Sequence, residues 1–353
     1  MGVKSVGFVK VYSNSEKYGL GETYSGVYAP ELIQPIVSFL ERHFVGRLLG
    51  DDQVFESIKS LPFIGGGGII QSVISAIEIA IWDLRGKILN KPTFQLLSNN
   101  FRKTTPVYAS SGTAAFSPDE IKKDVDKIVS LGYSAYKMRI GYQDWITDIK
   151  RVEAARKQLG DKDLMVDAIM GTIRPAWGAD KAINAARGLS EFDLRWLEEP
   201  THPVDIKSLA RVRSANIVPI AAGEAYTSES DFDSIFYHEA VDILQFDATH
   251  SGGIKFCMEL ARKAENQHLD SALHVWGSAV AIAANAQVAL AQPKISILEI
   301  PMVELELTDH MWIEKPIIKD GLWHCSHAPG LGVELSEELM HMYSFRVNSG
   351  YRL

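Results

Sequence analysis

The sequence has 353 residues, of which 46% are hydrophobic, and a formal net charge of −8. This length predicts one large domain with a smaller one attached, because single hydrophobic cores rarely grow so large. The acidic balance without a run of Lys or Arg argues against nucleic acid or a membrane surface as partner, and polar residues interrupt the longest apolar stretch, residues 275–291. With two cysteines that follow no spacing pattern, these features favour a soluble cytoplasmic protein with free thiols.

The N-terminal third mixes strand and helix patterns. Alternation within residues 6–24 predicts two short strands joined by a polar turn at residues 13–17. Apolar residues at three- and four-residue intervals then predict helices over about residues 30–49 and 69–89. Residues 65–68 are four glycines in a row, which form either a plain connector or a loop that lies close to a ligand.

From residue 106 onward, short apolar runs alternate with helical stretches. The predicted strands cover residues 106–110, 134–140, 164–167, 194–198, 218–223, 243–246, 271–274 and 297–300. One helix start is explicit, since Ser117, Pro118 and Glu120 form a capping box with proline at the first helical position. The alternation predicts an α/β fold with a parallel sheet, closed as a TIM barrel. An open doubly wound sheet is the alternative, but no glycine-rich phosphate fingerprint follows the first strand.

Polar residues stand at the ends of the predicted strands. They are Lys137 and Arg139, Asp167, Glu198, Glu224, Asp247, His274 and Glu299, in strand order. Each alone has a plain structural explanation: Asp167 as a helix N-cap, or Lys137 and Arg139 as an ion-pairing edge. Together they predict an active site, because strand ends of a β/α barrel open on one face.

Three of these carboxylates suggest a metal. Asp167, Glu198 and Glu224 end consecutive strands and offer the oxygen ligands that a hard cation takes, with Mg²⁺ as the default. Cationic residues stand on one side of them and a His–Asp pair on the other. We therefore expect a small-molecule carboxylate substrate to bind between two opposed proton-transfer groups.

The ordered motifs resemble the enolase superfamily, and within it the mandelate racemase subgroup. The matching segments are residues 76–84, 136–142, 196–200, 222–224, 245–247, 252–253, 298–299 and 329–333, with His274. The resemblance implies a modified TIM barrel, (β/α)7β, at residues 105–324 and an α+β capping domain at residues 1–104. Residues 325–353 are expected to pack back on that domain, and the protein to form a homo-oligomer, from dimer to octamer.

The resemblance also implies roles for single residues. Mg²⁺ would be bound by Asp167, Glu198 and Glu224, with Glu199 behind them. His274 would be the acid or base, held by Asp247, and Glu299 would hydrogen-bond the substrate carboxylate. Tyr24, Tyr28 and the loop of residues 63–68 would contact the substrate.

The sequence departs from this subgroup at three places. Arg139 stands where the second lysine of a Lys-x-Lys pair acts as a base, and an arginine keeps its proton at neutral pH. Ile169, in the substrate pocket, stands where some relatives carry a polar contact such as Asn. The N-terminus lacks a first strand and an active-site loop, so the gene model is either truncated or encodes an open pocket.

The arginine favours a lyase, a dehydratase that expels water from an acid sugar to give a 2-keto-3-deoxy acid. A racemase, an epimerase or a cycloisomerase acting next to a carboxylate is the alternative within the enzymes. A catalytically silent relative is a further hypothesis. A zinc hydrolase lacks support, because the chain has no His-x-His or His-Glu-x-x-His spacing.

Overall fold

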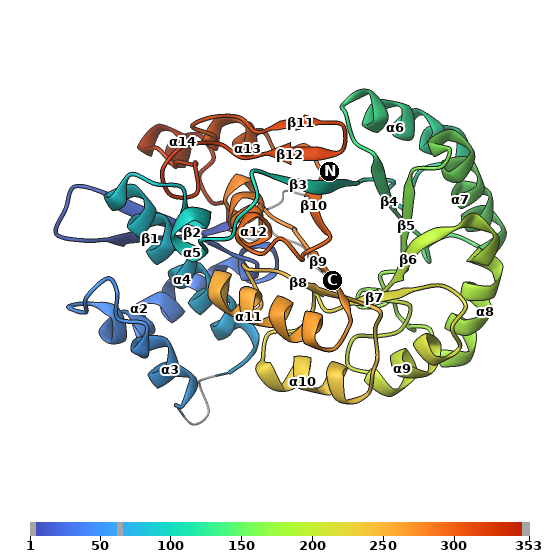
Figure 1. Cartoon of the computed structure of the whole chain (residues 1–353), viewed down its shortest axis with the longest axis horizontal. Coiled ribbons are helices and arrows are strands. Elements are labelled where there is room, and N and C mark those ends of the chain that lie inside the picture. Colours follow the sequence, from blue (N-terminus) through green and yellow to red (C-terminus); the bar gives the residue numbers. More distant parts are fainter. Residues whose placement is uncertain (1–4, 62–65, 348–353) are drawn as a thin grey trace.

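The computed structural model describes residues 5–61 and 66–347. Its centre is a closed barrel of eight parallel strands, β3 to β10, in which β10 pairs with β3 (Figure 1). The strands are β3 (Thr104–Ser110), β4 (Ala135–Arg139), β5 (Asp163–Asp167), β6 (Leu194–Glu198), β7 (Ile220–Ala222), β8 (Ile243–Phe246), β9 (Asp270–Leu273) and β10 (Ile297–Pro301). The connecting helices are α6 (Pro118–Ser130), α7 (Trp145–Leu159), α8 (Ala179–Leu189), α9 (Ile206–Ser214), α10 (Glu229–Tyr237), α11 (Gly253–Asn266) and α12 (Ala279–Ala291). The predicted (β/α)7β barrel is confirmed, and so is the capping box of Ser117 at the start of α6.

One layer of side chains fills the barrel interior. It takes one residue from each strand: Tyr108, Ala135, Met165, Trp196, Ala221, Ile243, Ala272 and Ile297. Side chains alternate between the two faces of a strand, so residues two positions further along also point inward. The residues two positions after this layer therefore also face the barrel interior, toward the carboxyl ends of the strands.

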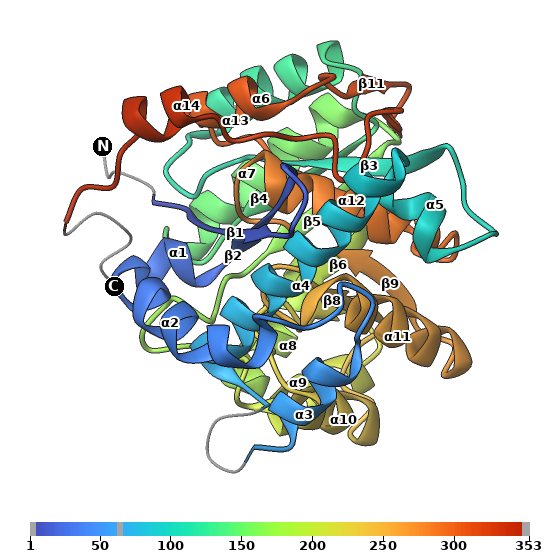
Figure 2. The same cartoon turned by 90° about the vertical axis from the view of Figure 1, so that its left-hand side faces the viewer.

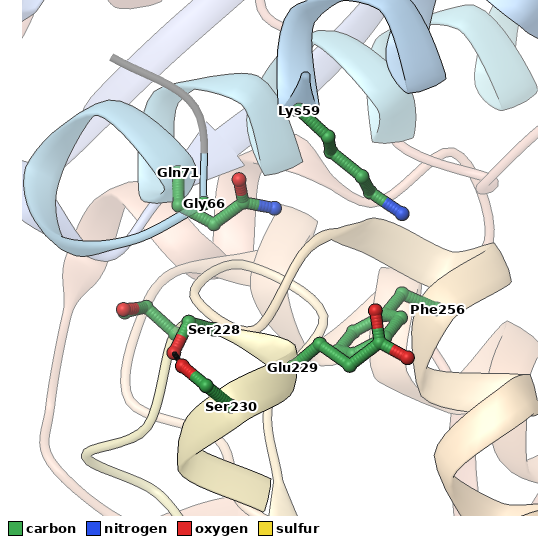
Figure 3. Close-up of a pocket in the computed structure, with 8 residues that line it drawn as sticks. Lys59, Gly66, Gln71, Ser228, Glu229, Ser230 and Phe256 are labelled. Atoms are coloured by element: carbon green, nitrogen blue, oxygen red, sulfur yellow. Dashed lines mark hydrogen bonds between the residues drawn. The ribbon is translucent and has the colours of Figure 1, made fainter. Parts of the chain in front are cut away.

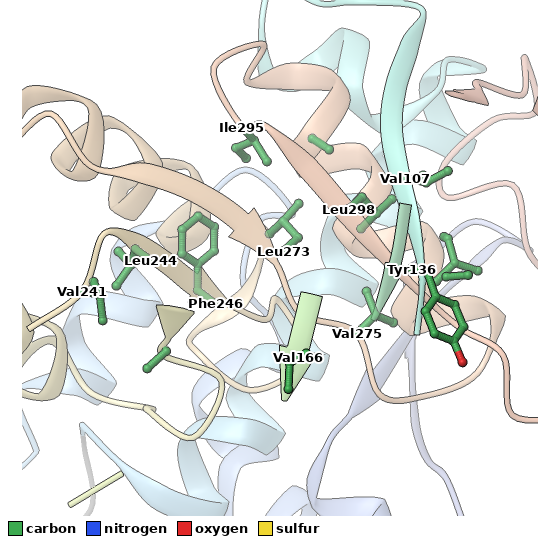
Figure 4. Close-up of a cluster of buried hydrophobic side chains, with 14 of the residues drawn as sticks. Val107, Tyr136, Val166, Val241, Leu244, Phe246, Leu273, Val275, Ile295 and Leu298 are labelled. Atoms are coloured by element: carbon green, nitrogen blue, oxygen red, sulfur yellow. The ribbon is translucent and has the colours of Figure 1, made fainter. Parts of the chain in front are cut away.

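The outward positions of the strands build the main core. Val107, Val166, Leu244 and Leu298 are each next in sequence to a residue of the interior layer, and they belong to the cluster that packs under the helices (Figure 4). Both faces of each strand are thus buried, as expected for parallel strands covered by helices. This double burial explains why the predicted strands read as apolar runs without alternation.

The residues before β3 form a capping region, defined here as residues 5–61 and 66–103. It contains the hairpin of β1 (Gly7–Tyr12) and β2 (Tyr18–Thr23) (Figure 2). Its helical elements are α1 (Ser25–Tyr28), the 3-10 turn η1 (Pro30–Leu32), α2 (Ile33–Phe44), α3 (Gln53–Lys59), α4 (Gly68–Leu89) and α5 (Thr93–Leu97). Strand β2 lies directly on α4: a Cβ added at Gly21 would stand 1.8 Å from the carbonyl oxygen of Ala76. The predicted strands and their turn are confirmed. The predicted helix at residues 30–49 was too long, since α2 ends at Phe44 and residues beyond it are largely exposed.

Two carboxylates of the capping region hold helix N-termini of the barrel. Glu22 on β2 accepts hydrogen bonds from the backbone N–H groups of Ser278 and Ala281 at the start of α12. Glu78 on α4 accepts from the backbone N–H groups of Ile254 and Lys255 at the start of α11. Negative charge at a helix N-terminus is favourable, so these contacts tie the capping region to the barrel.

The chain after β10 returns to the capping region. It forms α13 (Glu306–Met311), the hairpin β11 (Ile317–Lys319) and β12 (Leu322–His324), and α14 (Glu337–Met342); the remaining 3-10 turn, η2 (Ser190–Phe192), follows α8. Strand β12 pairs antiparallel with β3. Further on, Leu331 N–H donates to Asp83 Oδ1 on α4, at 2.8 Å, and Lys10 Nζ of β1 donates to the carbonyl of Leu335. Within the described residues, none of the helices has the length and apolar character that crossing a bilayer requires.

Candidate active site

The predicted site residues lie directly above the interior layer of the barrel. Lys137, Asp167, Glu198, His274 and Glu299 each stand two residues after a member of that layer, on β4, β5, β6, the end of β9 and β10. Strand alternation therefore points all five side chains into the carboxyl end of the barrel. All five are at most 5% exposed, so the structure brings them together in a site screened from water.

The carboxylates end neighbouring strands. Asp167 is the register partner of Glu198 between β5 and β6, and Glu224 follows β7 after Gly223. Glu198 is already bonded at both oxygens: Lys137 Nζ donates to Oε1 at 2.5 Å, and Trp196 Nε1 and Gln245 Nε2 donate to Oε2. Ion pairing and neutral donors therefore hold Glu198 in place.

The other carboxylates are less well compensated. Burial and, next, the charge of Glu198 together raise the pKa of Asp167 to about 8, since Lys137 and Arg139 offset them only in part. Burial and the charges of Glu224 and Asp167 raise the pKa of Glu199 well above its usual value, and its Oε1 has no hydrogen-bond partner among the described residues. Burial also raises the pKa of Glu224. The cluster thus carries more acidic groups than its cations can neutralise.

This excess fits a divalent cation, although the side chains are not arranged as a finished cage. Within residues 5–61 and 66–347, no three His, Cys, Asp or Glu side chains converge closely enough to hold a metal ion on their own. Mg²⁺ is bound in proteins by one or two carboxylates together with waters and substrate oxygens, so it does not need such a cage. The acidic donor set and the raised pKa values agree with a hard cation at this place.

One flank of the site carries two cations. Lys137 lies 2.5 Å from Glu198, 3.0 Å from Glu299 and 4.0 Å from Asp167. Burial disfavours its charge, but Glu198 and Glu299 raise its pKa well above the usual value. Arg139 donates to the carbonyl of Ser111 and the hydroxyl of Ser110, and its guanidinium lies 5.5 Å from the ring centre of Trp276. Both groups hold their protons at neutral pH.

The other flank carries the His–Asp pair. Nδ1 of His274 lies 3.0 Å from Asp247 Oδ2, and its Nε2 lies 3.3 Å from Glu224 Oε2. Burial disfavours the charged imidazole, but Glu224, Glu299 and Asp247 raise the pKa of His274 to about 10. Burial likewise works against the charge of Asp247, but the hydrogen bond and charge of His274 lower its pKa. His274 is oriented by Asp247 and presents Nε2 to the centre of the site.

Glu299 stands between the two flanks. Its Oε1 contacts Lys137, and its Oε2 accepts the backbone N–H of Val275 at 3.1 Å and lies 4.0 Å from His274 Nε2. Burial opposes ionisation, but Lys137 and His274 lower the pKa of Glu299 to about 2. It is therefore a permanent negative charge in this arrangement.

Two residues of the site adopt an uncommon backbone conformation. Ile169 has φ 44° and Glu199 has φ 40°, immediately beyond the ends of β5 and β6. This region is unusual for a β-branched residue and costs on the order of 1–3 kcal/mol. The N–H of Ile169 donates to Asp167 Oδ1 at 2.8 Å, so the strained turn fixes the position of that carboxylate.

The capping region closes one side of the site. The Tyr24 ring lies 5.9 Å from that of His274 and 5.6 Å from that of Tyr28, and its N–H donates to the carbonyl of Thr249. Tyr24, Tyr28 and Ile169 all line one cavity of about 640 Å³ that reaches Glu199 and Glu224. The loop of residues 63–68 was also predicted to contact the substrate. Its residues 63–65 lie outside the described residues, and the backbone N–H of Gly68 donates to the hydroxyl of Thr227.

A second cavity, of about 340 Å³, lies between the capping region and the starts of α10 and α11 (Figure 3). Lys59, Gln71, Glu229 and Phe256 line it, whereas the strand-end residues do not. Ser230 lines both cavities, so the two are neighbours. Of the carboxylate cluster, Glu199 and Glu224 line the larger cavity, and Tyr24, which also lines it, has its ring 5.9 Å from that of His274.

Sequence reasoning assigned no role to several residues that hold the site. Asn285 of α12 donates to Asp247 Oδ1 and also accepts the N–H of Ala248. Gln245 bonds Glu198, and the His250 ring lies 4.9 Å from that of Tyr24. The sequence did contain a signal for Asn285. It is a polar residue within the apolar helix α12, and a buried polar side chain needs a hydrogen-bond partner.

Comparison with known proteins identifies the family. The family model described as enolase C-terminal domain-like matches residues 120–339. A 3,6-anhydro-alpha-L-galactonate cycloisomerase of Streptomyces coelicolor is 32% identical over 268 residues, which cover 74% of this chain and 72% of that protein. An L-talarate/galactarate dehydratase of Salmonella typhimurium is 31% identical over 277 residues, which cover 78% of this chain and 66% of that protein.

Solved structures agree with this assignment. A racemase from Streptomyces coelicolor with bound magnesium has a TM-score of 0.85 at 29% identity, covering 95% of this chain and 90% of that chain. The chain therefore belongs to the enolase superfamily, with the mandelate racemase and muconate lactonizing enzymes, as its motifs predicted. Its relatives include dehydratases, cycloisomerases and racemases.

Proposed function

We propose that this protein is a Mg²⁺-dependent dehydratase that converts a hydroxy carboxylate of the acid-sugar type into a 2-keto-3-deoxy acid. One observation carries the proposal. The site has a single oriented acid–base residue, His274, and faces it with two cations that hold their protons, Lys137 and Arg139. Such a site can take and return a proton on one face of a substrate but lacks a partner base on the other.

The metal would be held by Asp167, Glu198 and Glu224, with Glu199 behind them. Support comes from their burial, from the raised pKa values of Asp167 and Glu199, and from magnesium in the related racemase structure. When bound, Mg²⁺ would stabilise the negative charge that develops on a substrate carboxylate as its α-proton leaves.

The protein's own residues would do the rest of the chemistry. Lys137 and Arg139 provide positive charge beside the substrate carboxylate, and Glu299 holds the ammonium of Lys137 in place at 3.0 Å. The charge of Glu224 does most to raise the pKa of His274, and a cation bound at Glu224 would offset it. The neutral imidazole would then remove the α-proton and, as the imidazolium, give a proton to the departing hydroxyl. Asp247 keeps Nδ1 of His274 protonated, so that Nε2 is the atom that exchanges protons.

The relatives favour a second candidate, a cycloisomerase. The 32% identical relative from Streptomyces coelicolor bears that name. Its reaction class would use the same proton-transfer residue next to a carboxylate, and a leaving group within the substrate would replace water. The substrate therefore distinguishes the two candidates better than the catalytic residues do.

The test is incubation of the Mg²⁺-loaded protein with a library of acid sugars in D₂O. A dehydratase yields a 2-keto-3-deoxy acid, which semicarbazide traps as a chromophore. Deuterium at the α-carbon with inverted configuration, and no keto acid, would reject dehydration in favour of racemisation. Keto acid from anhydro or lactone substrates alone would support the cycloisomerase.

A further inference from the structure

The larger cavity extends well beyond the reacting groups. It begins at Glu199 and Glu224 and continues along the loops after β6 and β7 to α9 and α10, where Ile206 and Ser234 line it. Its volume of about 640 Å³ is in the range of pockets that hold drug-sized ligands. If the carboxylate of a substrate binds at the strand ends, the rest of the substrate would therefore lie along this wall of the cavity.

The far wall has a definite chemistry. Pro203, Val204 and Ile206 are apolar, and Ser230 and Ser234 supply hydroxyl groups. None of the described residues that line the cavity is a lysine or an arginine. The carboxylate at this end is Asp231, whose Oδ2 accepts the backbone N–H groups of Thr227 and Ser228, and the imidazoles of His202 and His250 also line the cavity.

Two positively charged side chains near this region, Arg174 and Lys59, do not line the cavity. Arg174 is exposed and does not line the cavity; its guanidinium donates to the carbonyls of Gly171 and Ile173 and lies 3.1 Å from Nε2 of His202, and Gly171 and His202 do line it. Lys59 lines the second cavity (Figure 3), and its ammonium pairs with Glu56 at 3.3 Å. Neither ammonium nor guanidinium belongs to the wall that a substrate's far end would contact.

We propose that this cavity selects monocarboxylic acids with an uncharged far end and rejects dicarboxylic acids. The inference rests on the proposed function, because it assigns the first carboxylate to the strand ends. A second carboxylate would lose its hydration against an apolar wall and would meet Asp231 without a lysine or arginine in the described lining to compensate its charge. Aldonic acids, with a terminal hydroxyl, would instead meet the serine hydroxyls.

The experiment compares aldonic acids with the aldaric acids of matching configuration. Turnover is followed by keto-acid formation, and binding is measured by calorimetry on the Mg²⁺-loaded His274→Asn variant. We expect at least a tenfold preference for an aldonic acid in both kcat/KM and affinity. If aldonates bind selectively but no keto acid forms, the selectivity stands and the proposed dehydration fails. Equal or tighter binding of the aldaric partner, or no binding of any aldonate, would overturn the inference.

Variants that add or remove a positive charge near the cavity test the same preference between aldonic and aldaric acids. Val204 is 82% exposed, so Val204→Arg adds a cation to the cavity wall without burying it. We expect this variant to raise the ratio of aldarate to aldonate affinity at least tenfold, while the uncharged control Val204→Gln leaves the ratio unchanged. Arg174→Gln should also leave it unchanged. A loss of aldarate affinity in Arg174→Gln would show that Arg174 serves a distal carboxylate, which contradicts the proposal.

Discussion

Arg139 gives the site its asymmetry. Its guanidinium is fixed by Ser110 and Ser111 beside Trp276, and its chemistry excludes it as a base near neutral pH. A lysine in the same place would have an ammonium that can lose its proton when shielded from water. In the proposed function, the identity of this one residue would therefore separate elimination from racemisation.

We predict that Arg139→Lys shifts the outcome of proton abstraction. The variant should form less keto acid and incorporate more deuterium at the α-carbon of recovered substrate, because a second group can then return a proton. NMR of substrate recovered from D₂O measures both products. An unchanged ratio of deuterium to keto acid would show that Arg139 does not determine the fate of the intermediate.

His274 should dominate catalysis. We predict that His274→Asn lowers kcat by about 10²–10⁴-fold, the usual contribution of a general acid or base, and that it abolishes α-proton exchange. The exposed residue His341 on α14 offers the matched control, His341→Asn, with unchanged kcat. Retention of α-proton exchange in His274→Asn would assign the base elsewhere.

At the scale of elements, the helix caps supplied by Glu22 and Glu78 join the capping region to the barrel. Burial raises the pKa of Glu78 to about 7, and the N–H donors of Ile254 and Lys255 only partly offset this. A carboxyl whose pKa is higher in the folded state contributes stability below its unfolded pKa and loses it as pH rises through the folded pKa. This junction between α4 and α11 should therefore weaken between about pH 4.5 and 7.

We predict that Glu78→Gln removes this pH dependence. The Tm of the natural protein should fall relative to the variant as pH rises from about 5 to 8, by an amount that corresponds to on the order of 3 kcal/mol. Thermal unfolding followed by circular dichroism measures it. The exposed Glu56 on α3 gives the control, since Glu56→Gln should run parallel to the natural protein. Parallel curves for Glu78→Gln as well would contradict the prediction.

The elements differ in how far the sequence could predict them. The barrel strands were found because burial on both faces leaves apolar runs, and the predicted boundaries of all eight lie within two residues of the observed ones. The seven-residue helix α3 was missed, because it is too short to show a periodicity. The strand-end residues were found from their order, whereas the contacts of Asn285 and Gln245 depend on packing between strands and helices far apart in the chain.

At the scale of the whole molecule, the metal should act on stability as well as on activity. A ligand that binds only the folded state raises the free energy of unfolding by about 2.7 kcal/mol at a hundred times its Kd. We predict that millimolar Mg²⁺ raises the Tm and that EDTA abolishes turnover. Differential scanning calorimetry at several Mg²⁺ concentrations measures the first effect.

Matched variants identify the carboxylates responsible. Glu224→Gln should lose most of the rise in Tm with Mg²⁺, because it removes one proposed ligand. Glu229→Gln, on the nearby start of α10, should keep it. If the natural protein shows no rise in Tm and no heat of binding, a catalytically silent member of the family becomes the better explanation.

The returning C-terminal segment also constrains how the molecule can be made. Asp83 of the capping region accepts the backbone N–H of Leu331, and Lys10 of β1 donates to the carbonyl of Leu335. A ribosome synthesises the residues of the capping region first but supplies these partners only after the entire barrel has emerged. During translation, Oδ1 of the buried Asp83 therefore lacks its backbone N–H partner until this C-terminal segment has emerged.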